Sequence, residues 1–254
     1  MPSPLFQIQD LKYEIDPKID QKILELQKKF RKKFNQDERE KLARAEKIDF
    51  VYNTVALEGN TYSYAETETL LSGVTVGGHT IQEENEILDQ KEAWNLTLQK
   101  AFTKKVEITE ELIKDIHYRI GKNTVAKPGQ YRDGRVKIGG TEYIPPKTQS
   151  DIAYILKNFL KDFANLDNLA AHHKAIIIHF FIARLQPFFD GNKRTARLLL
   201  NFLLLQNAYP LLSIPVKTKQ KYIEAMIKGY ENLDINDLMK LINNLLLDKL
   251  ENIL

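Results

Sequence analysis

The sequence predicts an all-α fold that carries one short β-hairpin. The 254 residues include only 11 glycines and 9 prolines, which favours long helices over a turn-rich β architecture. Apolar residues make up 43% of the chain, enough for a sizeable core, and in most segments they recur at helical spacing. Residues 129–146 are the exception, because polar and apolar residues alternate there between turn glycines.

The N-terminal part is expected to form two amphipathic helices. Residues 17–34 are charged and place Ile23 and Phe30 on one apolar stripe. Asp37 and Glu40 have the spacing of a capping box and are expected to open a second helix. That helix should end at residues 58–59, because glycine is favoured just beyond a helix C-terminus. Further helices are predicted at residues 81–103, 109–121, 149–165, 169–185, 193–207, 218–230 and 235–252.

Residues 175–185 are apolar on nearly every side, which predicts a central buried helix. We expect this helix to deliver Gln186 to the loop that follows. The chain is expected to divide into an N-terminal helical segment (residues 1–80) and a core domain (residues 81–254). The core domain would contain both the hairpin and this loop.

Several function classes are disfavoured by composition. The absence of cysteine excludes disulfides, thiolate zinc sites and cysteine nucleophiles. The net charge is +3 and bases are mixed with acids, so a solvated helix surface is favoured over a nucleic-acid patch. His172 and His173 have no second group of ligands near them in the sequence, which argues against a metal site there.

The sequence also predicts a cytoplasmic protein without membrane contact. The first residues, Met1-Pro2-Ser3-Pro4, lack the basic-then-apolar pattern of a secretory signal. The apolar run at 198–205 contains Asn201 and is too short to span a bilayer. The apolar stripes of residues 17–34 and 235–252 could serve a homodimer, and core packing explains them equally well.

Residues 186–197 have the pattern of a polyphosphate cradle. Gly191 lets backbone amides approach an anion, and a helix that begins just after it would direct free N–H groups at that anion. Arg194 and Arg197 are three residues apart and can share one helix face. The carboxylate of Asp190 could hold Mg²⁺ on the same phosphates. Gln186, at the mouth of the cradle, cannot take a proton near neutral pH.

These residues resemble the signature of the Fic/Doc (Fido) family, His-Pro-Phe-x-Asp-Gly-Asn-Gly-Arg-x-x-Arg. Here the stretch reads Gln-Pro-Phe-Phe-Asp-Gly-Asn-Lys-Arg-Thr-Ala-Arg, so Gln186 replaces the histidine and Lys193 replaces the second glycine. His179 and Tyr222 also match family positions on either side of the signature. The predicted hairpin is similar to the family's flap, and the resemblance covers roughly residues 40–235.

A second motif resembles that of self-inhibited Fic proteins. Thr54, Glu58, Gly59 and Asn60 fit the pattern Ser/Thr-x-x-x-Glu-Gly/Asn, here at the end of a helix of about residues 38–58. The resemblance implies that Glu58 pairs with Arg197 and blocks the site of the γ-phosphate. A carboxylate would then occupy the guanidinium fork that a phosphate otherwise takes.

The resemblance implies AMP transfer from ATP to a hydroxyl of a target protein, with Mg²⁺ held at Asp190. The flap residues would clamp a segment of that target by strand pairing, as an exposed edge allows. The implied nucleotide-binding residues are Asp190, Gly191, Asn192, Lys193, Arg194, Arg197 and Tyr222, and the implied flap residues are Val136, Lys137, Ile138 and Gly139.

Two substitutions in the signature lead to alternative functions. Gln186 removes the general base, which typically contributes about a hundred- to ten-thousand-fold, so the expected enzyme is inactive or very weak. The first alternative is a catalytically dead ATP-binding module whose nucleotide alters how the flap meets a partner. The second follows from Lys193, since Asn-Lys-Arg-Thr-Ala is similar to the Doc branch, which implies protein phosphotransfer.

Overall fold

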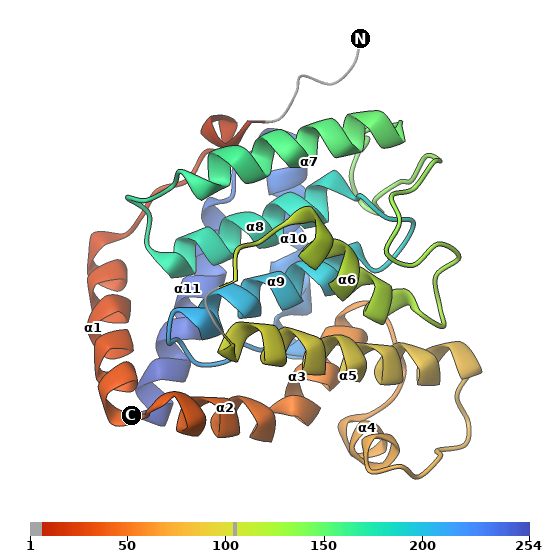
Figure 1. Cartoon of the computed structure of the whole chain (residues 1–254), viewed down its shortest axis with the longest axis horizontal. Helices are drawn as coiled ribbons and strands as arrows, with labels where there is room; N and C mark the ends of the chain where they lie inside the picture. Colours follow the sequence, from red (N-terminus) through yellow and green to blue (C-terminus); the bar gives the residue numbers. More distant parts are fainter. Residues whose placement is uncertain (1–6, 104–105) are drawn as a thin grey trace.

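A computed structural model describes residues 7–103 and 106–254 and consists of packed helices (Figure 1). Residues 1–4, on which the targeting expectation rests, lie outside the described residues. The α-helices are α1 (Pro17–Lys33), α2 (Gln36–Ala45), α3 (Lys47–Leu57), α4 (Tyr64–Leu71), α5 (Ile81–Phe102), α6 (Glu110–Gly121), α7 (Gln149–Ala164), α8 (Ala171–Leu185), α9 (Asn192–Gln206), α10 (Lys219–Asn232) and α11 (Asn236–Ile253). Two short 3₁₀ helices, Ile8–Asp10 and Val216–Thr218, complete the set.

The α8–α9 pair forms the centre of the fold, with α5, α6, α7 and α11 around it (Figure 1). Every residue of α8 except Ala171, Lys174 and Arg184 is buried, as its apolar sequence predicts. Because both helices are held by surrounding packing, the turn that joins them has a rigid support.

The predicted second helix is two helices. Glu46, with φ −90° and ψ 9°, ends α2 and begins α3. The start also differs from the prediction: Oδ1 of Asn35 accepts from the Glu38 N–H and caps α2, and the Glu38 carboxylate accepts from the Asn35 N–H. This reciprocal pair satisfies two of the free N–H groups at the helix start, so Asn35 takes the capping position instead of Asp37.

Helix α4 was absent from the prediction. The Ser63 hydroxyl accepts from the Glu66 N–H and caps α4, and the Glu66 carboxylate accepts from the Ser63 N–H. Ser63 and Glu66 have the spacing of a capping box, which is the sequence signal for this short helix. Leu70 packs with Val51 and Ile87 in a small apolar cluster separate from the main core.

The predicted β-hairpin at residues 129–146 is wrong as a strand pair. In the described residues this segment contains no β-ladder, and the single isolated bridge of the structure joins Lys12 and Asp234. Within it, the two ends of residues 134–146 are held instead by Arg132, which is fully buried and donates to the carbonyl groups of Gly134 and Pro146. Hydrogen bonds from one arginine side chain thus take the place of the cross-strand backbone hydrogen bonds that the alternating sequence pattern predicts.

Helices α1 and α11 lie side by side at one edge of the molecule (Figure 1). Ile23 and Phe30 of α1 and Leu246 and Leu250 of α11 are buried within the chain. Core packing therefore covers the two apolar stripes. Side chains from both predicted segments enter the same main cluster, and the boundary at residue 80 stays a prediction. None of the helices in the described residues is long and apolar enough to span a membrane.

The packing of α10 on α8 requires a residue without a side chain at position 229. A Cβ on Gly229 would lie 2.5 Å from Cε2 of buried Phe180 and 3.3 Å from Cγ2 of Ile235. We expect Gly229→Ala to lower the free energy of unfolding by about 1–3 kcal/mol, because overpacking outweighs the gain in helix propensity. Urea denaturation measures this. Gly77→Ala is the control, since no atom lies within 4 Å of its Cβ; an equal loss there would contradict the packing explanation.

Candidate functional site

The turn between α8 and α9 is shaped by one buried amide. Asn192 accepts a hydrogen bond from the Phe188 N–H and donates to the Phe188 carbonyl and to Oε1 of Gln186, each at 2.9 Å. Gln186 and Gly191, at either end of the loop, have φ values of 49° and 75°. Asn192 therefore supports the loop with its side chain, and the phosphate contact that the family resemblance implies for it stays a prediction.

Gly191 leaves the start of α9 open. It is the N-cap residue and offers no side chain, so the first N–H groups of α9 are not capped by a side chain. Its positive φ favours glycine, and a Cβ there would lie 3.1 Å from Cγ2 of Ile120. An uncapped helix N-terminus at the end of a glycine turn is suited to binding an anion.

His117 holds the loop from below and was missed in the sequence, where it has no visible partner. Its Nδ1 accepts from the Gly129 N–H at 2.9 Å, so the proton lies on Nε2, which donates to the Asp190 carbonyl at 2.9 Å. Burial lowers the pKa of His117 to about 4, which keeps the ring neutral. The ring also stacks on Phe188 at 3.5 Å between centroids, and a neutral ring suits this apolar contact.

Arg132 is the second residue that the sequence did not reveal. Its Nε donates to the Gln186 carbonyl at 2.6 Å, and its backbone N–H donates to the Pro187 carbonyl at 3.0 Å. The same guanidinium group holds both ends of residues 134–146, as described above. A single buried cation therefore sets the position of the flap segment relative to the loop.

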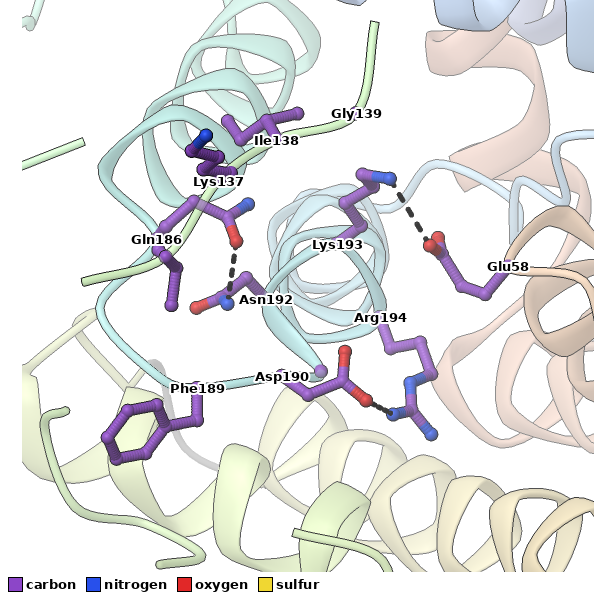
Figure 2. Close-up of a pocket in the computed structure, with 12 residues that line it drawn as sticks. Glu58, Lys137, Ile138, Gly139, Gln186, Phe189, Asp190, Asn192, Lys193 and Arg194 are labelled. Atoms are coloured by element: carbon purple, nitrogen blue, oxygen red, sulfur yellow. Dashed lines mark hydrogen bonds and ion pairs between the residues drawn. The ribbon is translucent and has the colours of Figure 1, made fainter. Parts of the chain in front are cut away.

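The loop, the flap segment and the end of α3 enclose a cleft of about 170 Å³. Figure 2 shows the flap residues Lys137–Gly139 across this cleft from Glu58. Its lining residues are Glu58, Val136, Lys137, Ile138, Gly139, Gln186, Phe189, Asp190, Gly191, Asn192, Lys193 and Arg194. The fold thus brings together the predicted residues, adds Phe189 to them, and leaves Arg197 and Tyr222 buried beneath the lining.

Glu58 and Arg197 form the ion pair that the sequence implied. Nη2 of Arg197 donates to Oε1 of Glu58 at 2.6 Å and to the Thr54 carbonyl at 3.1 Å. The Arg197 side chain is 2% exposed and that of Glu58 is 26% exposed, so solvent screens this pair only weakly. Because Glu58 follows the last residue of α3, the ion pair connects the N-terminal helices to α9.

Lys193 supplies a second cation to the same carboxylate. Its Nζ lies 3.4 Å from Oε2 of Glu58, as Figure 2 shows. Burial alone would raise the pKa of Glu58, but the charges of Arg197 and Lys193 outweigh that effect and lower the pKa to about 2. Lys193, which stands where the Fic/Doc signature has its second glycine, thus contacts Glu58 in this structure.

Arg194 and Asp190 form a second ion pair at the start of α9. Nη2 of Arg194 donates to Oδ2 of Asp190 at 3.0 Å (Figure 2). Nη1 of Arg194 is buried without a hydrogen-bond partner, while the Asp190 side chain is 68% exposed. The unpaired N–H group suits an anion in the cleft. An exposed carboxylate beside that anion suits Mg²⁺, which usually binds one or two carboxylates together with phosphate oxygens and water.

Position 186 carries a glutamine amide, which does not act as a base near neutral pH. Nε2 of Gln186 donates to the Ala183 carbonyl at 2.7 Å and its Oε1 accepts from Asn192, so both ends of the amide are engaged. His179 is fully buried, and burial together with the charge of Arg197 lowers its pKa to about 3. Its Nε2 lies 2.9 Å from the Tyr222 hydroxyl, and it is absent from the cleft lining.

Sequence comparison identifies the domain. Residues 107–204 match the Fic/DOC family. This chain contains a Fic/DOC domain. A relative from Drosophila erecta named protein adenylyltransferase Fic is 34% identical over 189 residues, which cover 71% of this chain and 37% of the relative. The Fic chain therefore spans little more than a third of the length of the curated relatives it matches.

Solved structures share this fold. Fic-1 (residues 134–508) from C. elegans superimposes with a TM-score of 0.79 at 26% identity, covering 92% of this chain and 70% of that one. A Fic domain containing signaling protein from Bacteroides thetaiotaomicron gives 0.76 at 23% identity, covering 92% and 94%. The helical Fic fold predicted from the sequence is thus confirmed.

The Glu58–Arg197 ion pair should leave a signature in the pH dependence of stability. Since its folded-state pKa is lower than the usual value of 4.5, Glu58 stabilises the fold above about pH 4.5 and loses this effect as pH falls toward 2. We expect Glu58→Gln to lower the free energy of unfolding by about 1–3 kcal/mol at pH 7 and by progressively less below pH 4.5. Urea denaturation at several pH values measures both effects.

The matched control is Glu68→Gln, which changes an exposed glutamate of α4. Its unfolding free energy should follow that of the parent chain within about 0.5 kcal/mol. A difference between the parent and Glu58→Gln that stayed constant down to pH 3 would contradict the assigned pKa of Glu58.

Proposed function

We propose that this Fic domain binds ATP with Mg²⁺ and was shaped for AMP transfer to a hydroxyl of a target protein. The cleft between the flap segment and the start of α9 carries this proposal, because it combines an uncapped helix N-terminus with three cationic side chains. The names of its relatives, protein adenylyltransferase Fic, support the same activity. A more distant protein of this fold, BepC from Bartonella tribocorum, was solved with bound AMPPNP.

In the proposed complex the phosphates lie against the backbone amides that follow Gly191. Arg194 would donate its free Nη1 to a phosphate oxygen, and Arg197 would do so once Glu58 withdraws. Asp190 would hold Mg²⁺, which would neutralise part of the negative charge of the phosphates. Tyr222 would keep Arg197 in place from below, since its hydroxyl lies 3.5 Å from Nη1 of that arginine.

AMP transfer needs a proton acceptor that this site lacks. A target hydroxyl attacks the α-phosphorus, the bond between the α-phosphorus and the bridging oxygen breaks, and pyrophosphate leaves. The hydroxyl proton must go to a base. Gln186 lines the cleft, and its engaged amide cannot accept a proton. We therefore expect nucleotide binding with little or no transfer.

Glu58 acts in this proposal as an internal inhibitor. It occupies the Arg197 guanidinium group, and Lys193 holds its second oxygen. A phosphate would have to displace a carboxylate held by two cations. This arrangement supports a domain that binds ATP weakly until its N-terminal helices move.

The flap segment is the proposed docking site for the target. Residues 136–139 line the cleft and form no ladder, so their backbone groups are suited to pairing with an extended peptide. A distant protein of the same fold, IbpAFic2, was solved covalently tethered to its partner Cdc42. The target of this chain is proposed only as a protein segment that presents a hydroxyl beside the flap.

A catalytically dead ATP-binding module is the second candidate. The two hydrogen bonds that hold the Gln186 amide favour it, because they tie the side chain into the loop in the way a structural residue would be tied. In this role ATP would change the position of the flap and thereby its contact with a partner. Both candidates share the same nucleotide site, and they differ only in whether a base at position 186 restores transfer.

Removing Glu58 should strengthen ATP binding. We expect Glu58→Gly to lower the Kd for ATP with Mg²⁺ by about ten- to a hundredfold, because the charged hydrogen bond that competes with phosphate is lost. Calorimetry measures the change. In an Arg197→Ala background the same substitution should have a smaller effect, since the Glu58–Arg197 pair no longer exists and only the Lys193 contact of Glu58 remains. An equal gain in both backgrounds would mean that Glu58 acts elsewhere.

Restoring a base should reveal any dormant transfer. We expect Gln186→His with Glu58→Gly to raise AMP incorporation by about a hundred- to ten-thousand-fold over Glu58→Gly alone. Histidine tolerates the left-handed backbone at this position better than most residues. The measurement uses ATP labelled at the α- or the γ-phosphate and follows label on the chain itself and on cell-extract proteins.

Each labelling result has a distinct meaning. Label from the α-phosphate alone supports AMP transfer. Label from the γ-phosphate alone assigns the phosphotransfer that Lys193 suggests and overturns the AMP proposal. If the double variant binds ATP but transfers neither label, the dead-module candidate replaces the dormant enzyme.

A further inference from the structure

We propose that Asp20, His172 and His173 form a binding site for one divalent transition-metal ion of the Zn²⁺ type. The site lies between α1 and the first turn of α8, which are neighbours at one side of the molecule (Figure 1). It is separate from the nucleotide cleft, since residue 173 precedes Gln186 by about 20 Å along α8.

The three side chains have the geometry of a metal site. Nε2 of His172 lies 3.0 Å from Oδ1 of Asp20, and Nε2 of His173 lies 3.5 Å from the same oxygen. All the candidate ligand atoms are within 4.8 Å of one another. In a tetrahedral zinc site with bonds of about 2.0–2.1 Å, ligand atoms are separated by about 3.3 Å. The two distances to Oδ1 of Asp20 lie on either side of that value.

The donor atoms are buried and lack hydrogen bonds. Both histidine side chains are 1% exposed. Oδ1 of Asp20, Nε2 of His172 and both ring nitrogens of His173 are without hydrogen-bond partners in the described structure. Leaving such groups buried and unpaired is costly. A cation that accepts one electron pair from each of the three side chains would satisfy Oδ1 of Asp20, Nε2 of His172 and one ring nitrogen of His173.

The ligand types select the class of ion. Two neutral imidazoles and one carboxylate suit Zn²⁺ and related transition metals, whereas Mg²⁺ and Ca²⁺ prefer oxygen alone. A neutral imidazole has one ring nitrogen with a free lone pair, which is the atom that binds such a metal. The Asp20 side chain is 23% exposed, which leaves room for water as a fourth ligand.

Tyr209 orients the first of the two rings. Its hydroxyl lies 3.0 Å from Nδ1 of His172, and Tyr209 itself is buried. If Nδ1 carries the proton and donates to this hydroxyl, the lone pair of Nε2 faces Asp20. Metal-binding histidines usually make such a second contact, which fixes the ring and its tautomer.

The proposed ion would join α1 to the central helix. Asp20 lies in the first turn of α1, and the two histidines lie about 150 residues later in the chain. A bond network of this kind ties the N-terminal helices to the core, and these helices carry Glu58. The ion is therefore assigned a structural role, independent of ATP.

The test uses the untagged full chain, freed of metal with a chelator and studied without nucleotide. Titration with Zn²⁺ by calorimetry should give one site per chain. Titration with Co²⁺ should give the visible absorption of a four- or five-coordinate ion. At a Zn²⁺ concentration about a hundredfold above Kd, the Tm should rise by roughly 5–10 °C.

Two variants test the ligands, and a third tests the contact that orients His172. Asp20→Asn and His173→Gln should each weaken Zn²⁺ binding by at least about a hundredfold, and Tyr209→Phe by about tenfold. His79→Gln is the matched control, because His79 also lies beside a carboxylate, 3.3 Å from Glu66, and should bind Zn²⁺ like the parent chain. Circular dichroism and the Tm without metal report whether each variant is folded.

The parent chain alone can overturn the proposal. If it shows no Zn²⁺ binding and no Co²⁺ absorption, the three side chains form only a buried polar cluster. Binding that Asp20→Asn and His173→Gln leave unchanged, or that His79→Gln abolishes, would move the ion elsewhere and equally overturn the assignment.

Discussion

The buried amide of Asn192 holds the turn between α8 and α9, and the rest of the candidate site depends on that turn. The Asn192 side chain makes three hydrogen bonds: it accepts from the Phe188 N–H and donates to the Phe188 carbonyl and to Oε1 of Gln186. The same turn exposes the N-terminus of α9 and sets the direction of Arg194. His117 and Arg132 then fasten the loop to α6 and to the flap segment. A change at Asn192 would therefore alter the anion site and the flap together.

Two carboxylates face the cations of this site, and they differ in how firmly they are held. Glu58 is mostly covered and has both oxygens on cations, so the pKa of its carboxyl is far below the usual range. Asp190 shares one oxygen with Arg194 and is largely exposed. The first suits a contact that must be displaced before phosphate can bind, and the second suits a metal ligand. In the proposed function, their difference in burial assigns inhibition to Glu58 and metal binding to Asp190.

The sequence predicted most helices within one or two residues, because helical periodicity and capping depend on neighbours three or four residues away. It also located most of the cleft, since residues 186–194 are contiguous and form one turn and one helix start. The prediction failed at the flap and at residues 46 and 64–71. At the flap, the alternation of polar and apolar residues suggested two strands. A strand needs a partner strand for its backbone hydrogen bonds. Here hydrogen bonds from the Arg132 side chain hold the segment instead.

The sequence by itself determined the helical class, the glycine turn before α9 and the absence of an ordinary base at position 186. These features are local, because they depend on residue type and on spacing within one or two turns. Only the tertiary structure decided which partner Lys193 contacts, where His117 and Arg132 donate, and that Asp20 meets His172 and His173. Those contacts join residues far apart in the chain, so they exist only once the helices have packed at a particular register and angle.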